Sequence, residues 1–250
     1  MTDILPPATD APRKPLADRV ILVTGATGGL GRVAVRALAR AGATVLLLAR
    51  HARRIDELYD EIEASGAPTP VASPLELAGQ KDAQFEELAQ MIEANLGRLD
   101  GIAHFASQFV DLAPLLHQRL EDWERAFAVN TLAPFALTRA CLPLLTRADD
   151  ASVLFCCEAH TLAPGAYWGG FAASQAALPG LVTTLADEHE GHPALRFNLL
   201  VPGAIRTPMR DRTHPGETAA ERRPADELAP LLLEWLGPAS RGRSGEIVRA

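Results

Sequence analysis

The chain has 250 residues, of which 48% are hydrophobic and 22% charged, a length and composition that suit one α/β domain with a sizeable core. Its net charge of −7 is spread along the chain and the arginines form no long run, which argues against nucleic acid or an anionic membrane surface as a partner. Three cysteines make no disulfide framework, and we see neither a secretory pattern nor an apolar run approaching a membrane span, so we expect a cytoplasmic protein that binds a small molecule.

Along the chain, a proline-rich start is followed by a regular alternation of short apolar runs and helical stretches. We expect residues 1–15 to form a flexible lead and residues 16–250 a single α/β domain of the doubly wound Rossmann type, with helices flanking a parallel sheet. Strands are predicted at 19–26, 44–50, 69–75, 99–106, 151–157, 195–202 and 245–250. Helices are predicted at 30–42, 52–65, 80–96, 114–147 with a break near Glu121, and 170–190.

Two segments depart from this regular pattern. Pro179 lies inside the predicted helix 170–190, where its ring clashes with the carbonyl of Gln175 four residues earlier, so we predict a kink there. Residues 203–227 are rich in turn formers and charge, which predicts a mobile loop beside a site.

The stretch VTGATGGLGRVAV joins the first predicted strand to the first helix and holds Gly25, Gly29 and Gly31 in a T-G-x-x-x-G-x-G spacing. Glycines let backbone amides approach a pyrophosphate without Cβ clashes, and the N-terminus of the following helix adds partial positive charge. Glycine also serves packing alone in many such turns, but the flanking strand and helix favour a dinucleotide-binding loop.

With this loop, the chain resembles the short-chain dehydrogenase/reductase family, most closely its bacterial branch of YciK-like oxidoreductases, from about Leu16 onward. The segments PLEL, AVNTLAPF and VPGAIRTPM carry the resemblance further along the chain. It implies a dimer or tetramer formed through the helices at 114–147 and 170–190. It also implies contacts with a dinucleotide from Thr24, Gly25, Thr27, Gly29, Leu30, Gly31, Arg50, Glu76, Leu77, Ala106, Gln175, Pro202, Gly203 and Thr207.

The choice of dinucleotide in this family is implied by the residue that ends the second strand. An acidic residue there binds the ribose 2′-hydroxyl, whereas a basic residue accommodates a 2′-phosphate. This chain has LLLARHARR, in which Arg50, with help from Arg53 or Arg54, could grip the phosphate through two hydrogen bonds. The arginines could also be only the solvated start of a helix, but we favour NADP(H) over NAD(H).

The resemblance implies three catalytic positions, and this chain departs from the family at each. A tyrosine passes a proton, a lysine four residues later lowers its pKa, and a serine about thirteen residues before it polarises the substrate oxygen. Those positions hold Phe171, Gln175 and Glu158. Phe171 has no proton to give and Gln175 has no charge, although its amide could bind the nicotinamide ribose. An ionised Glu158 would repel a developing oxyanion.

Two further elements of the family are partly retained. Asn130 is present, but without the lysine the proton relay that it serves is incomplete. The family's N-N-A-G segment beside the cofactor is replaced by HFAS at 104–107, which keeps Ala106.

Other residues could replace the lost acid. Tyr167 lies one helical turn before Phe171, and His160 and Glu158 are near enough in sequence to enter the site, although a lone tyrosine more often serves packing. Cys156 and Cys157 point to opposite faces of a strand, which argues against a shared metal, and we expect no metal site.

Three functions remain open at this stage. We favour a family member that keeps an NADP(H)-binding cleft but has lost proton transfer, and is therefore non-catalytic or strongly impaired. The first alternative is a working NADP(H)-dependent oxidoreductase that acts on a carbonyl or alcohol through a rearranged acid. The second alternative is a structural or partner-binding subunit that binds no nucleotide.

Overall fold

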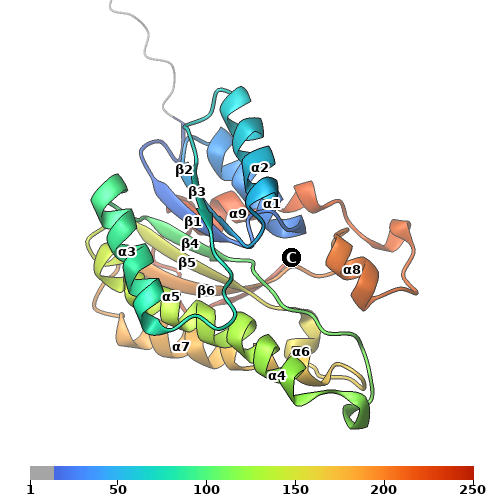
Figure 1. Cartoon of the computed structure of the whole chain (residues 1–250). Helices are drawn as coiled ribbons and strands as arrows, with labels where there is room; N and C mark the ends of the chain where they lie inside the picture. The colour runs from blue at the N-terminus through green and yellow to red at the C-terminus, as the bar shows by residue number, and fades with distance from the viewer. Residues whose placement is uncertain (1–13) are drawn as a thin grey trace, which may run out of the picture.

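The computed structural model describes residues 14–250, and a seven-stranded parallel sheet runs through its centre (Figure 1). The strand order is β3-β2-β1-β4-β5-β6-β7, which reverses between β1 and β4 and confirms the predicted doubly wound fold. The predicted lead lies outside the described residues except for Lys14 and Pro15. The strands are β1 Val20–Thr24, β2 Thr44–Ala49, β3 Val71–Pro74, β4 Gly101–His104, β5 Ala151–Cys156, β6 Leu195–Val201 and β7 Ile247–Arg249.

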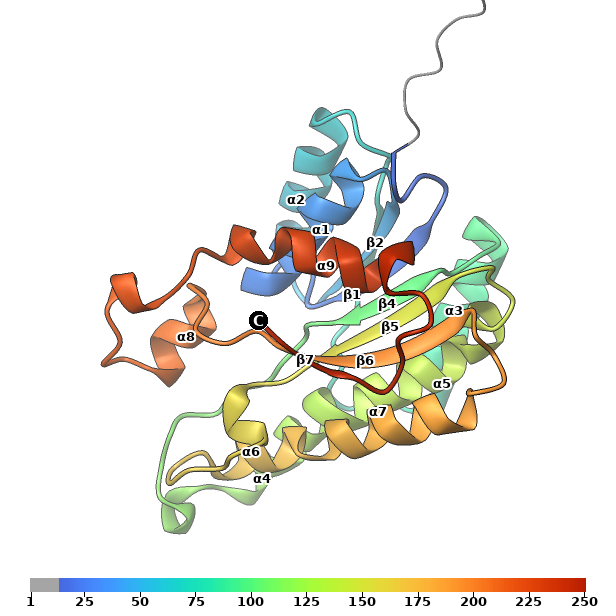
Figure 2. The same cartoon turned by 180° about the vertical axis from the view of Figure 1, so that it is seen from behind.

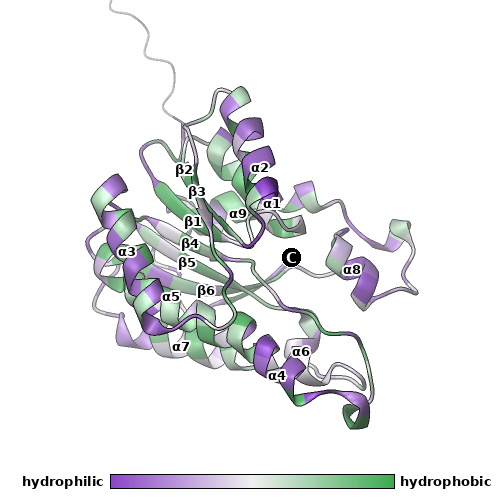
Figure 3. Ribbon diagram, viewed as in Figure 1, coloured by the Kyte–Doolittle hydropathy of each residue, from purple (hydrophilic) through white to green (hydrophobic). Residues whose placement is uncertain are grey.

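Helices cover both faces of the sheet, as Figures 1 and 2 show from opposite sides. One face carries α1 (Gly29–Arg40), α2 (Ala52–Ala64) and α9 (Ala229–Leu236). The other carries α3 (Asp82–Leu96), α5 (Ala133–Leu145) and α7 (Ala177–Glu188). Apolar residues gather along the strands and on the inner sides of the helices (Figure 3). A sheet covered on both faces requires strands that are apolar throughout, and the central strands have that composition.

The helix α9 was not predicted from the sequence. Its eight residues, APLLLEWL, make only two turns and are apolar on nearly every side, so they show no amphipathic period. The helix packs against α1 and buries Leu232, Trp235 and Leu236. Its formation therefore depends on a groove that the neighbouring elements provide.

The predicted helix 114–147 begins later than expected. A 3₁₀ turn at Leu115–His117 precedes α4 (Leu120–Phe127), and α4 continues through a π-helical turn (Ala128–Leu132) into α5. This 26-residue helix, Leu120–Leu145, has a mean hydropathy of 1.3 over an 18-residue window, so by length and composition alone it could cross a membrane. We had expected no such run, but 56% of that window is buried, as in a core helix.

The two irregular segments behave differently from each other. The predicted kink at Pro179 is confirmed, because α6 (Gly169–Gln175) ends before Ala176 and α7 begins after it. Residues 203–227 are more regular than a loop, since they contain α8 (Pro208–Thr213), the 3₁₀ turn Ala219–Glu221 and the start of a second 3₁₀ turn, Ala225–Leu228. Thr207 caps α8 by accepting a hydrogen bond from the Arg210 amide at 3.1 Å.

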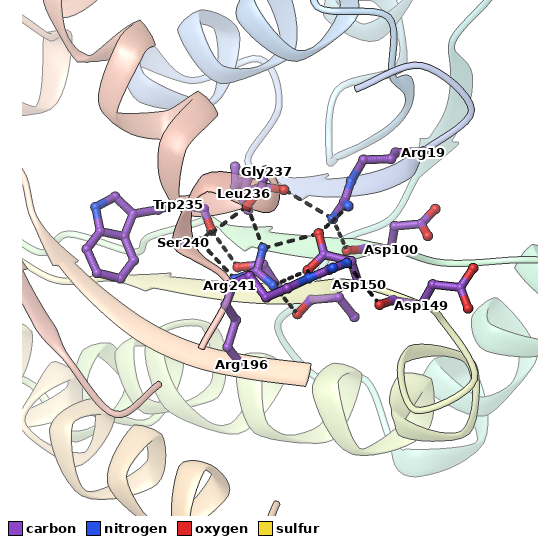
Figure 4. A network of polar contacts seen from close by, with 12 residues as sticks. Arg19, Asp100, Asp149, Asp150, Arg196, Trp235, Leu236, Gly237, Ser240 and Arg241 are labelled. Atoms are coloured by element: carbon purple, nitrogen blue, oxygen red, sulfur yellow. Dashed lines mark hydrogen bonds and ion pairs between the residues drawn. The ribbon is translucent and has the colours of Figure 1, made fainter. Parts of the chain in front are cut away.

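A buried ionic network joins the amino ends of the strands (Figure 4). Asp150, which precedes β5, accepts hydrogen bonds from Arg19 before β1 at 2.5 Å and from Arg196 in β6 at 2.6 Å. Arg196 also donates to Gly237 and Ser240 beyond α9. Burial favours the neutral carboxyl, but the hydrogen bonds and charges of Arg196 and Arg19 outweigh it and lower the pKa of Asp150.

We predict that Asp150→Asn lowers the free energy of unfolding by about 3–5 kcal/mol at neutral pH, because it leaves two buried guanidinium groups without their carboxylate. Asp149→Asn is the matched control, because Asp149 is exposed beside it. Urea denaturation measures both. The pKa of Asp150 is lower in the folded chain than the usual 3.9 or so, so its contribution is complete above about pH 5 and is lost as the pH falls through the folded value. Equal stabilities of the two variants would contradict this role.

Candidate functional site

A cleft opens at the carboxyl ends of the strands, beside the point where the strand order reverses. Such crevices are where ligands bind in open α/β sheets. The turn after β1, the loops after β2 and β3, and the segments that follow β4, β5 and β6 line it. Of the sequence-predicted cofactor contacts, all but Thr24 and Gly31 line this cleft, and so do Glu158 and Phe171.

Thr24 and Gly31 do not line the cleft, but they determine the shape of the glycine turn that does. The Thr24 hydroxyl accepts a hydrogen bond from the Ala106 amide at 3.2 Å, which fixes the end of β4 against the turn. A Cβ atom on Gly31 would lie 2.1 Å from the carbonyl oxygen of Gly25, and one on Gly25, whose φ is +64°, would lie 2.7 Å from the Ala106 nitrogen. Both glycines are therefore required by the close approach of the backbone.

Arg50 stands at one end of the cleft with its guanidinium unpaired among the described residues. Of its two suggested helpers, Arg54 also lines the cleft. Arg53 does not, since its side chain is 92% exposed and pairs with Glu57 at 3.3 Å. The site thus brings Arg50 and Arg54 together and leaves Arg53 outside.

Arginines that the sequence reasoning missed lie in a groove next to the glycine turn. They are Arg32, Arg36 and Arg206, which line this groove together with Arg54. Arg36 is already held by both carboxylate oxygens of Glu61, but the buried Nε of Arg32 has no hydrogen-bond partner among the described residues. The position of Arg32 directly after the glycine motif was the signal that could have found it.

Asn130 is buried behind the cleft. Its side-chain oxygen accepts from the Gln108 amide at 2.7 Å, and its nitrogen donates to the Gln108 carbonyl at 3.0 Å and to the Ser174 hydroxyl at 2.8 Å. It lies in the π-helical turn that interrupts the long helix. In this chain Asn130 therefore holds the loop after β4 against α6.

Phe171 forms part of an apolar wall of the cleft. Its side chain is buried, with the ring of Phe109 edge-on at 5.2 Å and that of Trp168 at 6.0 Å. Met209 from α8 packs against the same cluster. The wall has no hydroxyl where the resemblance places the catalytic tyrosine.

Both the oxygen and the nitrogen of the Gln175 side-chain amide form hydrogen bonds. Its oxygen accepts hydrogen bonds from the Glu158 backbone amide at 2.9 Å and from the Thr161 hydroxyl at 3.0 Å. Its nitrogen donates to the Ser107 hydroxyl at 3.4 Å. The uncharged side chain therefore ties the segment after β5 to the loop after β4.

Glu158 meets a cation that the sequence reasoning did not anticipate. Nη1 of Arg210, in α8, lies 3.0 Å from Oε1 of Glu158, and Nε of Arg210 donates to Glu217 at 2.8 Å. Burial opposes the charge of Arg210, but the bond to Glu217 and the charge of Glu158 raise its pKa. The carboxylate of Glu158 is therefore paired with the guanidinium of Arg210, whereas the sequence alone suggested an isolated negative charge.

The suggested replacement acids differ in their placement. Tyr167 is 57% exposed and does not line the cleft, so the structure does not place it where it could act on a bound substrate. His160 stacks on Trp168, with ring centroids 3.8 Å apart, beside His214. Burial, the largest factor, lowers the pKa of His214 from its usual value.

Burial shifts the pKa values of Cys156 at the end of β5, of Cys157 directly after it and of His104 at the end of β4. Cys156 and Cys157 both reach the cleft, and burial raises the pKa of Cys157 to about 11 and that of Cys156 well above its usual value. Burial lowers the pKa of His104 to about 3, so this side chain is neutral, and it contacts Thr138 at 2.9 Å. Phe105, Ala106 and Ser107 line the cleft directly after it.

Known proteins share both this sequence and this fold. The family model for short chain dehydrogenases matches residues 19–218. The uncharacterized oxidoreductase YciK of Escherichia coli K12 is 37% identical over 230 residues, which are 92% of this chain and 90% of that protein.

Two solved structures superpose over nearly the whole chain. One from Pseudomonas syringae is 40% identical, with a TM-score of 0.91, and the match covers 96% of this chain and 97% of that one. Another, from Escherichia coli CFT073 in complex with NADPH, is 36% identical, with a TM-score of 0.91 and coverage of 96% and 99%. This chain, with its glycine turn at the switch point of a parallel sheet, therefore belongs to the short-chain dehydrogenase family.

Proposed function

We propose that this protein binds NADP(H) in the cleft but has lost the proton transfer of working short-chain dehydrogenases, and is therefore non-catalytic or strongly impaired. One observation carries this proposal. Phe171, Gln175 and Glu158 line the cleft, and the family resemblance expects a tyrosine, a lysine and a serine in their places, so none of them supplies a tuned proton donor. A dinucleotide-responsive or partner-binding role follows.

Binding of NADP(H) is supported by the lining of the cleft and by a relative. Backbone glycines form one end, while Arg50 and Arg54 offer guanidinium groups that can receive a 2′-phosphate. The structural relative from Escherichia coli CFT073 was solved with NADPH. These features favour the proposal over a subunit that binds no nucleotide.

The loss of proton transfer is supported by how the replaced residues are used. The amide of Gln175 is committed to Glu158, Thr161 and Ser107, and the carboxylate of Glu158 to Arg210. Each replaced side chain thus serves the local structure.

We further infer that the protein acts as a cytoplasmic homo-oligomer. Leu132 and Phe135 lie on the long helix and are 57% and 41% exposed, an apolar surface that a second copy would cover. Sedimentation of the purified chain tests the oligomeric state, and fractionation of the source cells tests the location.

Replacing Arg50 by alanine is expected to weaken NADPH binding about 10- to 100-fold and to leave NADH binding nearly unchanged, because one charge-assisted contact with the 2′-phosphate contributes about 1.5–3 kcal/mol. Isothermal titration of both dinucleotides against both proteins measures this. Arg53→Ala is the matched control, because Arg53 lies outside the cleft and carries the same charge. Equal affinities of the unaltered protein for NADPH and NADH would refute the phosphate role.

Restoring Phe171→Tyr and Gln175→Lys together is expected to yield at most weak turnover of aldehydes, ketones or alcohols, far below the enzyme median of about 10 per second. The new lysine would lose the contacts of Gln175, and the charge pair of Glu158 and Arg210 would remain where the substrate oxygen belongs. Initial rates with NADPH or NADP⁺ over a substrate panel measure this. Full activity in the double variant would show that the rest of the site is intact, and typical enzyme rates in the unaltered protein would refute the proposed loss of catalysis.

A further inference from the structure

Three potential metal ligands converge beside the cleft. Glu158 and His160 follow β5, and His214 follows α8, so they come from two segments far apart in the chain. Their ligand atoms all lie within 4.8 Å of one another. All three residues are partly buried. Two imidazoles and one carboxylate form a donor set that suits zinc and similar divalent transition metals better than magnesium or calcium.

His160 offers a nitrogen that the protein does not satisfy. Its Nδ1 is buried and has no hydrogen-bond partner among the described residues. The Oε1 atom of Glu158 lies 3.6 Å away, which is too far for a hydrogen bond. Two ligands on one tetrahedral zinc, each bonded at about 2.0–2.1 Å, lie about 3.4 Å apart. The separation therefore suits a shared cation better than a direct contact.

The rings of both histidines are held in place. His160 stacks on Trp168 with an interplanar angle of 7°. Nδ1 of His214 lies 2.9 Å from the Thr213 hydroxyl, which also lies 3.4 Å from the Arg210 carbonyl and can donate its proton there. In that arrangement the hydroxyl accepts the Nδ1 proton of His214 and leaves Nε2 free as a ligand.

The nearby arginine does not remove the negative charge that a cation needs. Arg210 contacts Glu158, but it also bonds Glu217, which accepts from it at 2.8 Å through Oε2. Arg222 in turn bonds Asp211 as well as Glu217. The cluster therefore holds three carboxylates, of Glu158, Glu217 and Asp211, and two guanidinium groups, of Arg210 and Arg222. One carboxylate charge remains in excess. A divalent ion would be attracted to that excess.

We propose that Glu158, His160 and His214 bind a zinc-class divalent metal ion, which would join the segment after β5 to the end of α8 at this side of the cleft. The opposite faces of Cys156 and Cys157 had predicted no metal site, and this ligand set comes from other residues. The proposal goes beyond nucleotide binding and is tested without nucleotide.

The test is a titration of the full chain with Co²⁺ after removal of metal by a chelator. We expect one ion per chain, with the visible absorption of four- or five-coordinate cobalt, displaced by Zn²⁺. His160→Ala and His214→Ala should each weaken binding by about 100-fold or more, and Thr213→Val, which removes only the orienting hydroxyl, by about 10- to 100-fold. His192 is an exposed histidine in the turn after α7, and His192→Ala should bind as the unaltered chain does.

Unchanged affinity in His160→Ala and His214→Ala, with both variants folded by circular dichroism, would overturn the proposal. A measurement on the unaltered chain covers the case in which these variants fail to fold. X-ray absorption of the zinc-loaded protein should show two imidazole ligands. A spectrum without imidazole, or no binding of either metal, would overturn the proposal as well.

Discussion

The buried carboxylate of Asp150 is the interaction on which the architecture depends. It joins Arg19 and Arg196, and through them the amino ends of β1, β5 and β6. Because the strands are parallel, a constraint at their amino ends also sets where their carboxyl ends stop. The loops that build the cleft therefore start from fixed positions. Charged groups so deeply buried are tolerated only when each is paired and hydrogen-bonded, as these are.

At the other end of the strands, where their carboxyl ends lie, polar side chains hold the loops together. Asn130 binds both backbone groups of Gln108, and Gln175 connects the segment after β5 with Ser107. The hydrogen-bonding capacity of both side chains is thus used within the protein. These contacts fix the shape of the cleft on this side.

The segment after β6 decides the electrostatics of the site. It carries α8 across the cleft and places Arg210 against Glu158 and His214 beside His160. A carboxylate beside the cleft would repel an oxyanion if it were alone, but the ion pair between Glu158 and Arg210 offsets part of its charge. The same segment contributes Thr207 and Met209 to the lining, so nucleotide cleft and ionic cluster share one structural element.

Much of this structure was predictable because local sequence carries it. Runs that are apolar on both faces specify buried parallel strands, the spacing of Gly25, Gly29 and Gly31 specifies a close backbone turn, and Pro179 specifies a helix break. That Phe171 carries no hydroxyl and Gln175 no charge is visible in the sequence as well. Only the tertiary structure revealed the α9 helix, because two turns give no period, and the pairing of Glu158 with Arg210. Partners separated by 52 residues leave no local pattern, since their contact depends on how α8 folds back over the sheet.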